Sequence, residues 1–201
     1  MSKTVFLYLS ALIILQQVRS LVFVAKFSES LSHDQLTRML TNEKNRYQLF
    51  ECARNQHLKG LKGGYLLLDD TVLEKPYAKC LEEACWGYSG KSKKVVYGIP
   101  IVTLLWSDGE RMVPLGFRVY SAGESTKTQL ALELLSEARN RLKLKPQWVL
   151  FDSWYASKAI LKRLSDYGWA FITQLKKNRN FNNVALEDYR KTPYWNEVGF
   201  L

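Results

Sequence analysis

Residues 64–77 read GYLLLDDTVLEKPY, and this stretch decides how the rest of the chain is interpreted. Its residues 65–68 form an unbroken apolar run, which is typical of a short strand buried on both faces of a sheet. Two glycines come before the run and end the helical pattern that precedes it. Asp69 and Asp70 follow the run directly, so the pattern predicts a buried strand that ends in two carboxylates.

A second stretch repeats this arrangement later in the chain. Residues 147–157 read QWVLFDSWYAS, in which the apolar run 148–151 is followed by Asp152. The same reasoning predicts another short buried strand that ends in a carboxylate.

The segments around these two strands predict an α/β fold with a mixed five-stranded sheet and flanking helices. Residues 71–93 lack steady periodicity and carry Pro, Gly and Ser, so we interpret them as an irregular surface segment. The other predicted elements are a strand at 94–106, a hairpin turn at Asp108 and Gly109, a strand at 111–121, a helix that begins with a capping box of Thr126 and Gln129 and stops before Pro146, a helix at 157–167 closed by Gly168, and a strand at 169–175.

In a sheet built in this order, the first and fourth strands can lie side by side and run parallel, so their carboxyl ends meet at one edge. Neighbouring strands are about 4.8 Å apart, so Asp70 and Asp152 can come together although 82 residues separate them. Two close carboxylates repel each other unless a cation such as Mg²⁺ lies between them. We therefore predict that Asp70 and Asp152 bind a divalent metal. The alternative is that both only cap strand ends or form turns.

Asp69 is left out of this predicted site. Side chains alternate between the two faces of a strand, so Asp69 points away from the face that carries Asp70. We interpret it as a neighbour of the site and not as a ligand.

Residues 1–60 are predicted to be a small helical region, with Ser32 as the N-cap of one of its helices. This helix is either the second helix of a DNA-binding helix-turn-helix or an ordinary amphipathic surface helix. In the first case Arg38, Lys44 and Arg46 are available to contact phosphates.

The first residues imitate a signal peptide, because Lys3 is followed by the apolar run 5–15. The run is far shorter than the roughly 20 residues that cross a bilayer, and QQVRS replaces a small-residue cleavage site. We expect a buried helix and no membrane partner, and we interpret the three cysteines as structural thiols in a reducing compartment. The expected location is the cytoplasm, in association with the nucleoid.

The chain carries 29 basic and 19 acidic residues, which gives a net charge of +10 and a pI near 9.5. This balance favours a polyanionic partner, either nucleic acid or an anionic membrane surface. Basic residues near the first aspartate and after the fifth strand are either phosphate contacts or ordinary solvated residues: Lys75, Lys79, Lys91, Lys93, Lys94, Lys176, Lys177 and Arg179. Trp154 and Tyr155 either stack on an unpaired base or pack under the following helix.

Four motifs, LLLDDTVLEKPY, YGIPIVTLLWSDG, PLGFRVY and FDSWYAS, resemble the core of bacterial insertion-sequence DDE transposases, in the group with the Y-x2-R-x3-E-x6-K signature. The resemblance runs from about residue 30 to the end, and we take residues 61–201 as the catalytic core. It implies an RNase H-like fold that binds Mg²⁺ or Mn²⁺, nicks DNA at the ends of the element and joins the freed 3′-hydroxyl to target DNA. In that family the first two catalytic acids match Asp70 and Asp152, and the expected partners are terminal inverted repeats, target DNA and a second copy of the chain.

The third acid of that family, a Glu within the signature, has no match after Asp152. Glu187 lies 35 residues after Asp152, a separation familiar from integrases of the same superfamily, but its surroundings lack the apolar periodicity of a packed helix. We therefore expect a C-terminally truncated copy that is inactive alone. The alternatives are a catalytically inactive remnant that binds DNA or dimerises, and a basic protein associated with membranes.

Overall fold

The computed structural model describes residues 20–27, 32–59, 63–78, 81–176, 179–181 and 184–189. The chain divides into two compact units, Met1–Gly60 and Leu61–Leu201. Each unit is considered by itself below.

The described part of the first unit is helical, with α2 (Leu21–Phe27), α3 (His33–Thr41) and α4 (Glu43–Leu58). Ser32 caps α3 as predicted, because its hydroxyl oxygen accepts a hydrogen bond from the backbone N–H of Gln35 at 3.1 Å. The predicted buried helix at 5–15 lies outside the described residues. Within the described segments, no helix combines the length and the apolarity needed to cross a bilayer.

The helix-turn-helix interpretation stays a prediction. The helix α3 follows α2 and buries Leu36 and Met39 on its inner face, as any amphipathic helix does. Lys44 and Arg46 fall within α4, where the side chains at those positions are outside the description.

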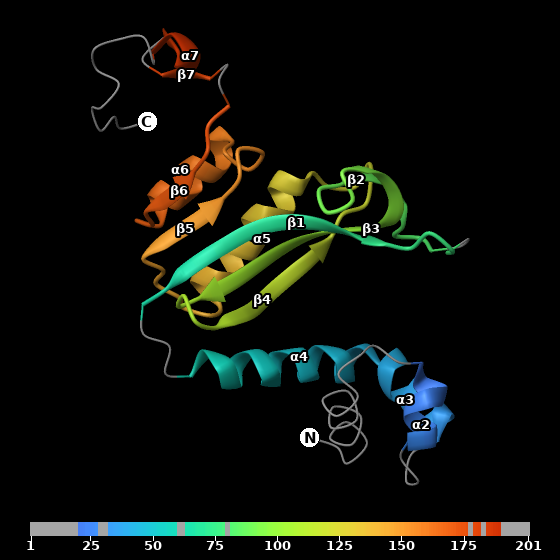
Figure 1. The fold of residues 1–201 in the computed structure, drawn as a ribbon. Coiled ribbons are helices and arrows are strands. Elements are labelled where there is room, and N and C mark those ends of the chain that lie inside the picture. Colours follow the sequence, from blue (N-terminus) through green and yellow to red (C-terminus); the bar gives the residue numbers. More distant parts are fainter. Residues whose placement is uncertain are drawn as a thin grey trace. The chain divides into compact units, whose positions relative to one another are not determined.

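The second unit is built on a mixed sheet of six strands (Figure 1). The strands are β1 (Tyr65–Glu74), β2 (Cys85–Ser89), β3 (Lys94–Ser107), β4 (Met112–Val119), β5 (Trp148–Phe151) and β6 (Phe171–Thr173). Their order is β2-β3-β1-β5-β6, and β4 also pairs with β3. As predicted, β1 and β5 are parallel neighbours, with Leu68 opposite Phe151, while β1, β3 and β4 pair in antiparallel fashion.

The predicted count of five strands is wrong. The additional strand is β2, which pairs with the beginning of β3 inside the segment that we interpreted as irregular. In β2 two strongly exposed aromatic residues alternate with Gly87 and half-buried or buried small residues, so the run has no apolar face to mark it in the sequence.

The close pairing of β1 with β3 depends on Gly98, because a Cβ at this position would lie 2.4 Å from the carbonyl oxygen of Leu73.

Two helices, α5 (Lys127–Asn140) and α6 (Lys158–Asp166), complete the core. The predicted capping box of Thr126 and Gln129 is present at the start of α5, and Gly168 follows α6 with a positive φ of 66°. In Figure 1 α5 crosses behind the sheet. The buried side chains of α5 and of the sheet include Leu66, Leu68, Val102, Leu104, Trp106, Leu130, Ala131, Leu134, Leu135 and Ala138.

The last described segments are β7 (Asn180–Phe181), β8 (Val184–Ala185) and the short helix α7 (Leu186–Tyr189). The two strands pair with each other and not with the main sheet. Glu187 lies in α7, and its side chain is outside the description.

Candidate active site

The parallel pairing of β1 and β5 brings the predicted aspartates to one region of the sheet. The pairing ends at Leu68 of β1 and Phe151 of β5, and the residues that follow these two are Asp69 and Asp152. The prediction that β1 ends at its aspartates is wrong, since β1 continues to Glu74 along β3. Asp70 therefore lies where β1 loses β5 as a neighbour but keeps β3, which fixes its backbone while one side of the strand opens.

The carboxylate of Asp70 holds two partners. It lies on the same face of β1 as the buried Leu66 and Leu68, which is the face towards α5. Its Oδ2 is 2.5 Å from the ammonium of Lys127 at the start of α5, and its Oδ1 accepts a hydrogen bond from the Tyr155 hydroxyl at 3.0 Å. Both side chains of the ion pair are about three-quarters buried, with 22% of Asp70 and 26% of Lys127 exposed. Such a pair is screened less by salt than one at an open surface.

Tyr155 is fully buried, so for this residue the packing interpretation is the right one. Burial raises the pKa of its hydroxyl well above the usual range, and the neighbouring charge of Asp70 raises it further. The hydroxyl therefore stays protonated and serves as a permanent hydrogen-bond donor to Asp70.

Asp152 forms a tight turn directly after β5. Its Oδ1 accepts hydrogen bonds from the backbone N–H groups of Trp154 at 2.9 Å and Tyr155 at 3.4 Å. These are the contacts of a turn-forming aspartate, the alternative named for this position. They also hold the exposed carboxylate in one orientation beside Asp69 and Asp70.

The carboxylate of Asp69 interacts electrostatically with Asp70 and Asp152. Burial raises the pKa of its carboxyl, and the charges of Asp70 and Asp152 raise it further, against the hydrogen bond that it accepts from the N–H of Asp70. Three carboxylates thus share one electrostatic neighbourhood. Asp69 was excluded because the argument from alternation treats only the strand itself and ignores the neighbouring β5.

The oxygen donors of this region fit a hard divalent cation such as Mg²⁺ or Mn²⁺. One donor atom, Oδ2 of Asp70, already faces a cation in the form of the Lys127 ammonium. Among the residues that the structure describes, no three His, Cys, Asp or Glu side chains are arranged as a ready metal cluster. Metal binding by Asp70 and Asp152 therefore remains a prediction, and Lys127 pairs with one of the oxygens that this prediction assigns to the metal.

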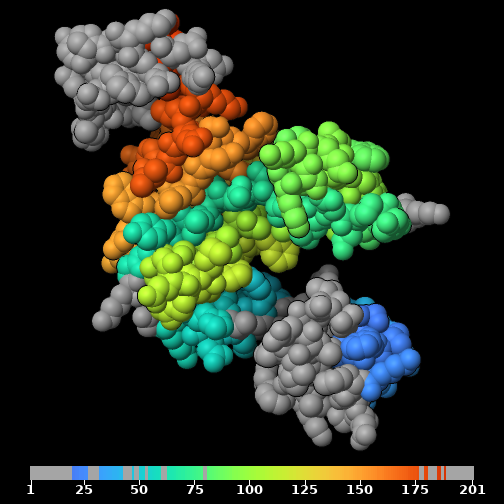
Figure 2. Space-filling model, in the orientation of Figure 1, coloured from blue at the N-terminus to red at the C-terminus, as the bar shows by residue number. Residues whose placement is uncertain are grey.

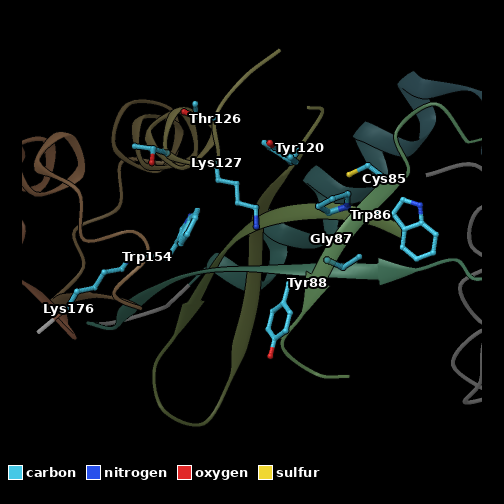
Figure 3. Close-up of a pocket in the computed structure, with 12 residues that line it drawn as sticks. Cys85, Trp86, Gly87, Tyr88, Tyr120, Thr126, Lys127, Trp154 and Lys176 are labelled. Carbon is cyan, nitrogen blue, oxygen red and sulfur yellow. The ribbon is translucent and has the colours of Figure 1, made fainter. Parts of the chain in front are cut away.

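A pocket of about 440 Å³ opens beside Asp70. It is lined by Val72 and Pro100 of the sheet, by β2, by the beginning of α5, and by Trp154 and Lys176 (Figure 3). The ammonium of Lys127 lies 5.9 Å from the ring centres of Tyr120 and Trp154, and that of Lys176 lies 5.2 Å from Trp154. The pocket thus combines aromatic faces with two positive charges.

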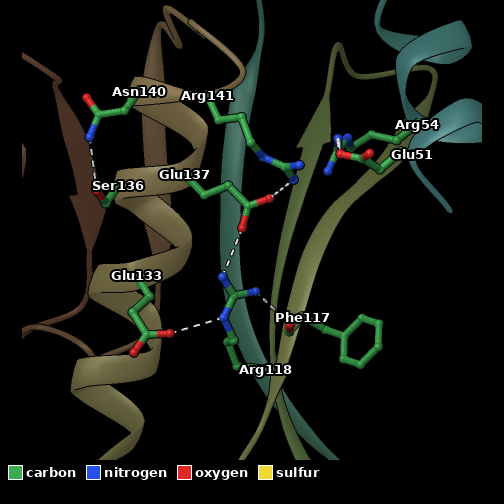
Figure 4. A network of polar contacts seen from close by, with 9 residues as sticks. All are labelled: Glu51, Arg54, Phe117, Arg118, Glu133, Ser136, Glu137, Asn140 and Arg141. Atoms are coloured by element: carbon green, nitrogen blue, oxygen red, sulfur yellow. Dashed lines mark hydrogen bonds and ion pairs between the residues drawn. The ribbon is translucent and has the colours of Figure 1, made fainter. Parts of the chain in front are cut away.

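An ion-pair network fixes α5, and with it Lys127, on the sheet (Figure 4). Arg118 of β4 donates to Glu133 at 3.1 Å and to Glu137 at 2.9 Å, and Arg141 also pairs with Glu137. Burial alone would raise the pKa of Glu137, but the hydrogen bonds from the two arginines outweigh it and hold this pKa below its usual value.

One known protein family matches this chain. The model of the family described as "Transposase DDE domain" matches residues 61–199. No curated protein matches the chain. Among solved structures, the piggyBac transposase in a cryo-EM synaptic complex with hairpin DNA is 15% identical with a TM-score of 0.49, covering 88% of this chain and 41% of that one. The Mos1 strand transfer complex is 14% identical with a TM-score of 0.34, covering 87% and 58%. This chain spans less than two thirds of the length of either structure's chain.

Proposed function

The chain belongs to the transposase DDE domain family, and from this premise we propose that it carries the metal-dependent DNA cleavage and strand-transfer site of a transposase. The observation that supports this most is the parallel pairing of β1 with β5, which brings Asp70 and Asp152 to one edge of the sheet. The same pairing supports the RNase H-like core that the sequence motifs imply. In the proposal, Asp70 and Asp152 are the first two catalytic acids and hold Mg²⁺ or Mn²⁺.

The residues around the two acids have defined tasks in this proposal. Tyr155 donates to Oδ1 of Asp70, and the backbone N–H groups of Trp154 and Tyr155 orient Asp152, so both carboxylates are held before a ligand arrives. Lys127 balances the charge of Asp70. The metal, when bound, supplies activation of the attacking water or 3′-hydroxyl and stabilisation of the leaving oxygen.

The finer parts of the assignment also belong to the proposal. They are the bacterial insertion-sequence origin, the Y-x2-R-x3-E-x6-K group, a homodimer on DNA, and a cytoplasmic, nucleoid-associated location. The signature does not occur in residues 1–201. The partner is proposed to be DNA, the terminal repeats and the target, in agreement with the net charge of +10.

A second candidate function is DNA binding without catalysis. It is favoured by the ion pair between Lys127 and Asp70, which keeps this acid neutralised within the fold. A binder of this kind needs the positive surface but not the carboxylates.

The test compares Asp70→Ala with Asp166→Ala, a matched loss of an exposed carboxylate at the end of α6. Mn²⁺ binding by calorimetry and nicking of supercoiled plasmid are measured beside affinity for duplex DNA. We expect Asp70→Ala to lose Mn²⁺ binding and any nicking, with DNA affinity changed less than about twofold, since one acid removed from a basic surface alters few phosphate contacts. Equal Mn²⁺ binding by the two variants would refute the proposed site and leave the second function.

A further inference from the structure

The hairpin of β2 and β3, residues 85–98, carries a concentration of positive charge that the candidate active site does not use. Its sequence, CWGYSGKSKKVVYG, contains three lysines and no acidic residue. The lysines are Lys91, Lys93 and Lys94, all exposed at the turn that joins the two strands. A single short hairpin thus presents three ammonium groups within a few residues.

One face of this hairpin is apolar and open. Trp86 and Tyr88 alternate with Gly87 and lie opposite Tyr97 and Val95 of β3, so these four side chains share a face of the sheet. Trp86 is 71% exposed, Tyr88 65% and Val95 60%. Trp86 is oriented by a tilted ring contact with Tyr97 at 5.6 Å. Exposed aromatic side chains gathered in this way mark a contact surface more often than lone exposed residues do.

The turn of the hairpin is held in one conformation. Ser89 donates to the carboxylate of Glu74 at 3.0 Å, Ser92 donates to the same carboxylate, and the backbone N–H of Ser92 donates to the Ser89 hydroxyl at 3.2 Å. These hydrogen bonds lower the pKa of Glu74, and the nearby Lys94 and Lys91 lower it further. A braced turn places its lysines without a large loss of conformational entropy on binding.

The hairpin also borders the pocket beside Asp70. Residues 85–88 form one wall of the pocket, and Lys127 and Trp154 form another (Figure 3). Figure 2 shows the green segment that includes this hairpin at the surface of the second unit. The register sets Trp86 and Tyr88 opposite Tyr97 and Val95 of β3 and sets Asp70 opposite Val102, so the exposed aromatic side chains lie on the other face of the sheet from the Asp70 carboxylate.

We propose that the hairpin at residues 85–98 is a DNA-contacting element, with Lys91, Lys93 and Lys94 on backbone phosphates and Trp86 and Tyr88 against sugar or base faces. The proposal rests on the proposed function, since it names a surface by which the core holds its DNA. Charge complementarity selects DNA over a second copy of this chain, because the chain carries net positive charge and the hairpin has no acidic residue to pair with its own lysines.

The first experiment removes the three positive charges of the hairpin, and its control removes three positive charges elsewhere, so both variants have the same net charge. The variant Lys91→Gln/Lys93→Gln/Lys94→Gln is compared with Lys143→Gln/Lys145→Gln/Lys162→Gln, which removes three exposed lysines elsewhere in the same unit. Affinity for a short fluorescent duplex is measured by anisotropy over a salt series without divalent metal, and circular dichroism checks folding. We expect the hairpin variant to bind roughly tenfold more weakly, with a salt slope shallower by about 2 to 3, since each lost phosphate contact removes about 0.9 from the slope.

The control variant has the same net charge as the hairpin variant. If the position of the charges matters as well as their number, its DNA binding should weaken by less than about a third as much. Equal weakening by both variants, or no weakening by the hairpin variant, overturns the proposal. Trp86→Ser/Tyr88→Ser provides a second measurement. Weaker DNA binding by this variant supports the proposal, whereas unchanged DNA binding together with loss of a dimer in sedimentation assigns the face to self-association and overturns it.

The outcomes for the hairpin and for the catalytic site remain separable. If Asp70→Ala abolishes Mn²⁺ binding while the hairpin variants bind DNA normally, only the hairpin inference fails. If the hairpin variants lose DNA affinity while Asp70→Ala binds Mn²⁺ like the unchanged protein, the metal site fails and the DNA-contacting hairpin stands.

Discussion

At the scale of single residues, the candidate site is organised by one cationic side chain and one buried hydroxyl, which both contact the carboxylate of Asp70. The ammonium of Lys127 stands 2.5 Å from Oδ2, and the Tyr155 hydroxyl occupies Oδ1. A divalent ion that approaches Oδ2 must compete with the ammonium, since both are attracted by the same negative charge. Lys127 thus stabilises the metal-free protein and opposes the first step of metal binding.

This competition predicts opposite effects of Lys127→Met on stability and on metal affinity. Loss of the ammonium leaves a partly buried carboxylate without its charge partner, which should cost about 1 to 3 kcal/mol of unfolding free energy. It should also tighten Mn²⁺ binding roughly tenfold, because the competing cation is gone. Urea denaturation and calorimetry measure the two quantities, with Lys158→Met at the exposed start of α6 as the control. Unchanged or weaker Mn²⁺ binding would show that Lys127 does not compete.

Sequence reasoning predicted Asp70 and Asp152 as the acids of the site but did not predict the side chains that contact Asp70. Asp70 and Asp152 were predictable because each follows a short apolar strand, a local pattern. Lys127 was missed because its contact with Asp70 spans 57 residues and depends on how α5 packs over β1, which no local pattern records. Asp69 was excluded by an argument that considered its own strand alone, whereas its charge environment comes from β5 as well.

At the scale of elements, the helices and the central strands followed from capping residues and apolar runs, whereas β2 did not. A strand with a continuous apolar run can be predicted from the sequence. The strand β2 has no such run, because it pairs with β3 and exposes its largest side chains. The position of α5 is likewise set by tertiary contacts. Arg118 links β4 to Glu133 and Glu137 of the helix across 15 and 19 residues, and such pairing between a strand and a helix cannot be deduced from spacing along the chain.

This link predicts a stability that depends on pH. The pKa of Glu137 is lower in the folded chain than in the unfolded one, so its contribution is fully present above the unfolded value, near pH 4.5, and is lost as the pH falls through the folded value. Glu137→Gln should therefore destabilise the protein by about 2 kcal/mol near neutral pH and progressively less in acid. Thermal unfolding over a pH series tests this, with Glu133→Gln as the control because Glu133 is 55% exposed and pairs with Arg118 alone in the network. A deficit of Glu137→Gln that stays constant down to acid pH would contradict the linkage.

At the scale of the whole molecule, the positive charge is distributed over both compact units. Residues 1–60 hold 8 basic and 4 acidic residues, and residues 61–201 hold 21 and 15, which gives +4 and +6. Electrostatic attraction to DNA therefore does not belong to one unit alone. The hairpin at 85–98 accounts for three of the positive charges of the second unit and contains no acidic residue of its own.

The division into two units predicts where a protease cuts first. Residues 59–64 read KGLKGG, which places two trypsin sites, Lys59 and Lys62, at the boundary between the units. Cleavage needs a segment that can leave its hydrogen bonds, and a boundary with three glycines meets this need more easily than paired strands do. We expect limited trypsin digestion to yield a fragment that begins at Gly60 or Gly63 before any cut appears at Lys94 of β3 or Arg118 of β4, as mass spectrometry of a time course will reveal. Lys94, at the first position of β3, serves as the internal comparison. If cleavage at Lys94 comes first, the hairpin is less firmly braced than its hydrogen bonds imply, and the boundary near residue 60 is the better protected of the two.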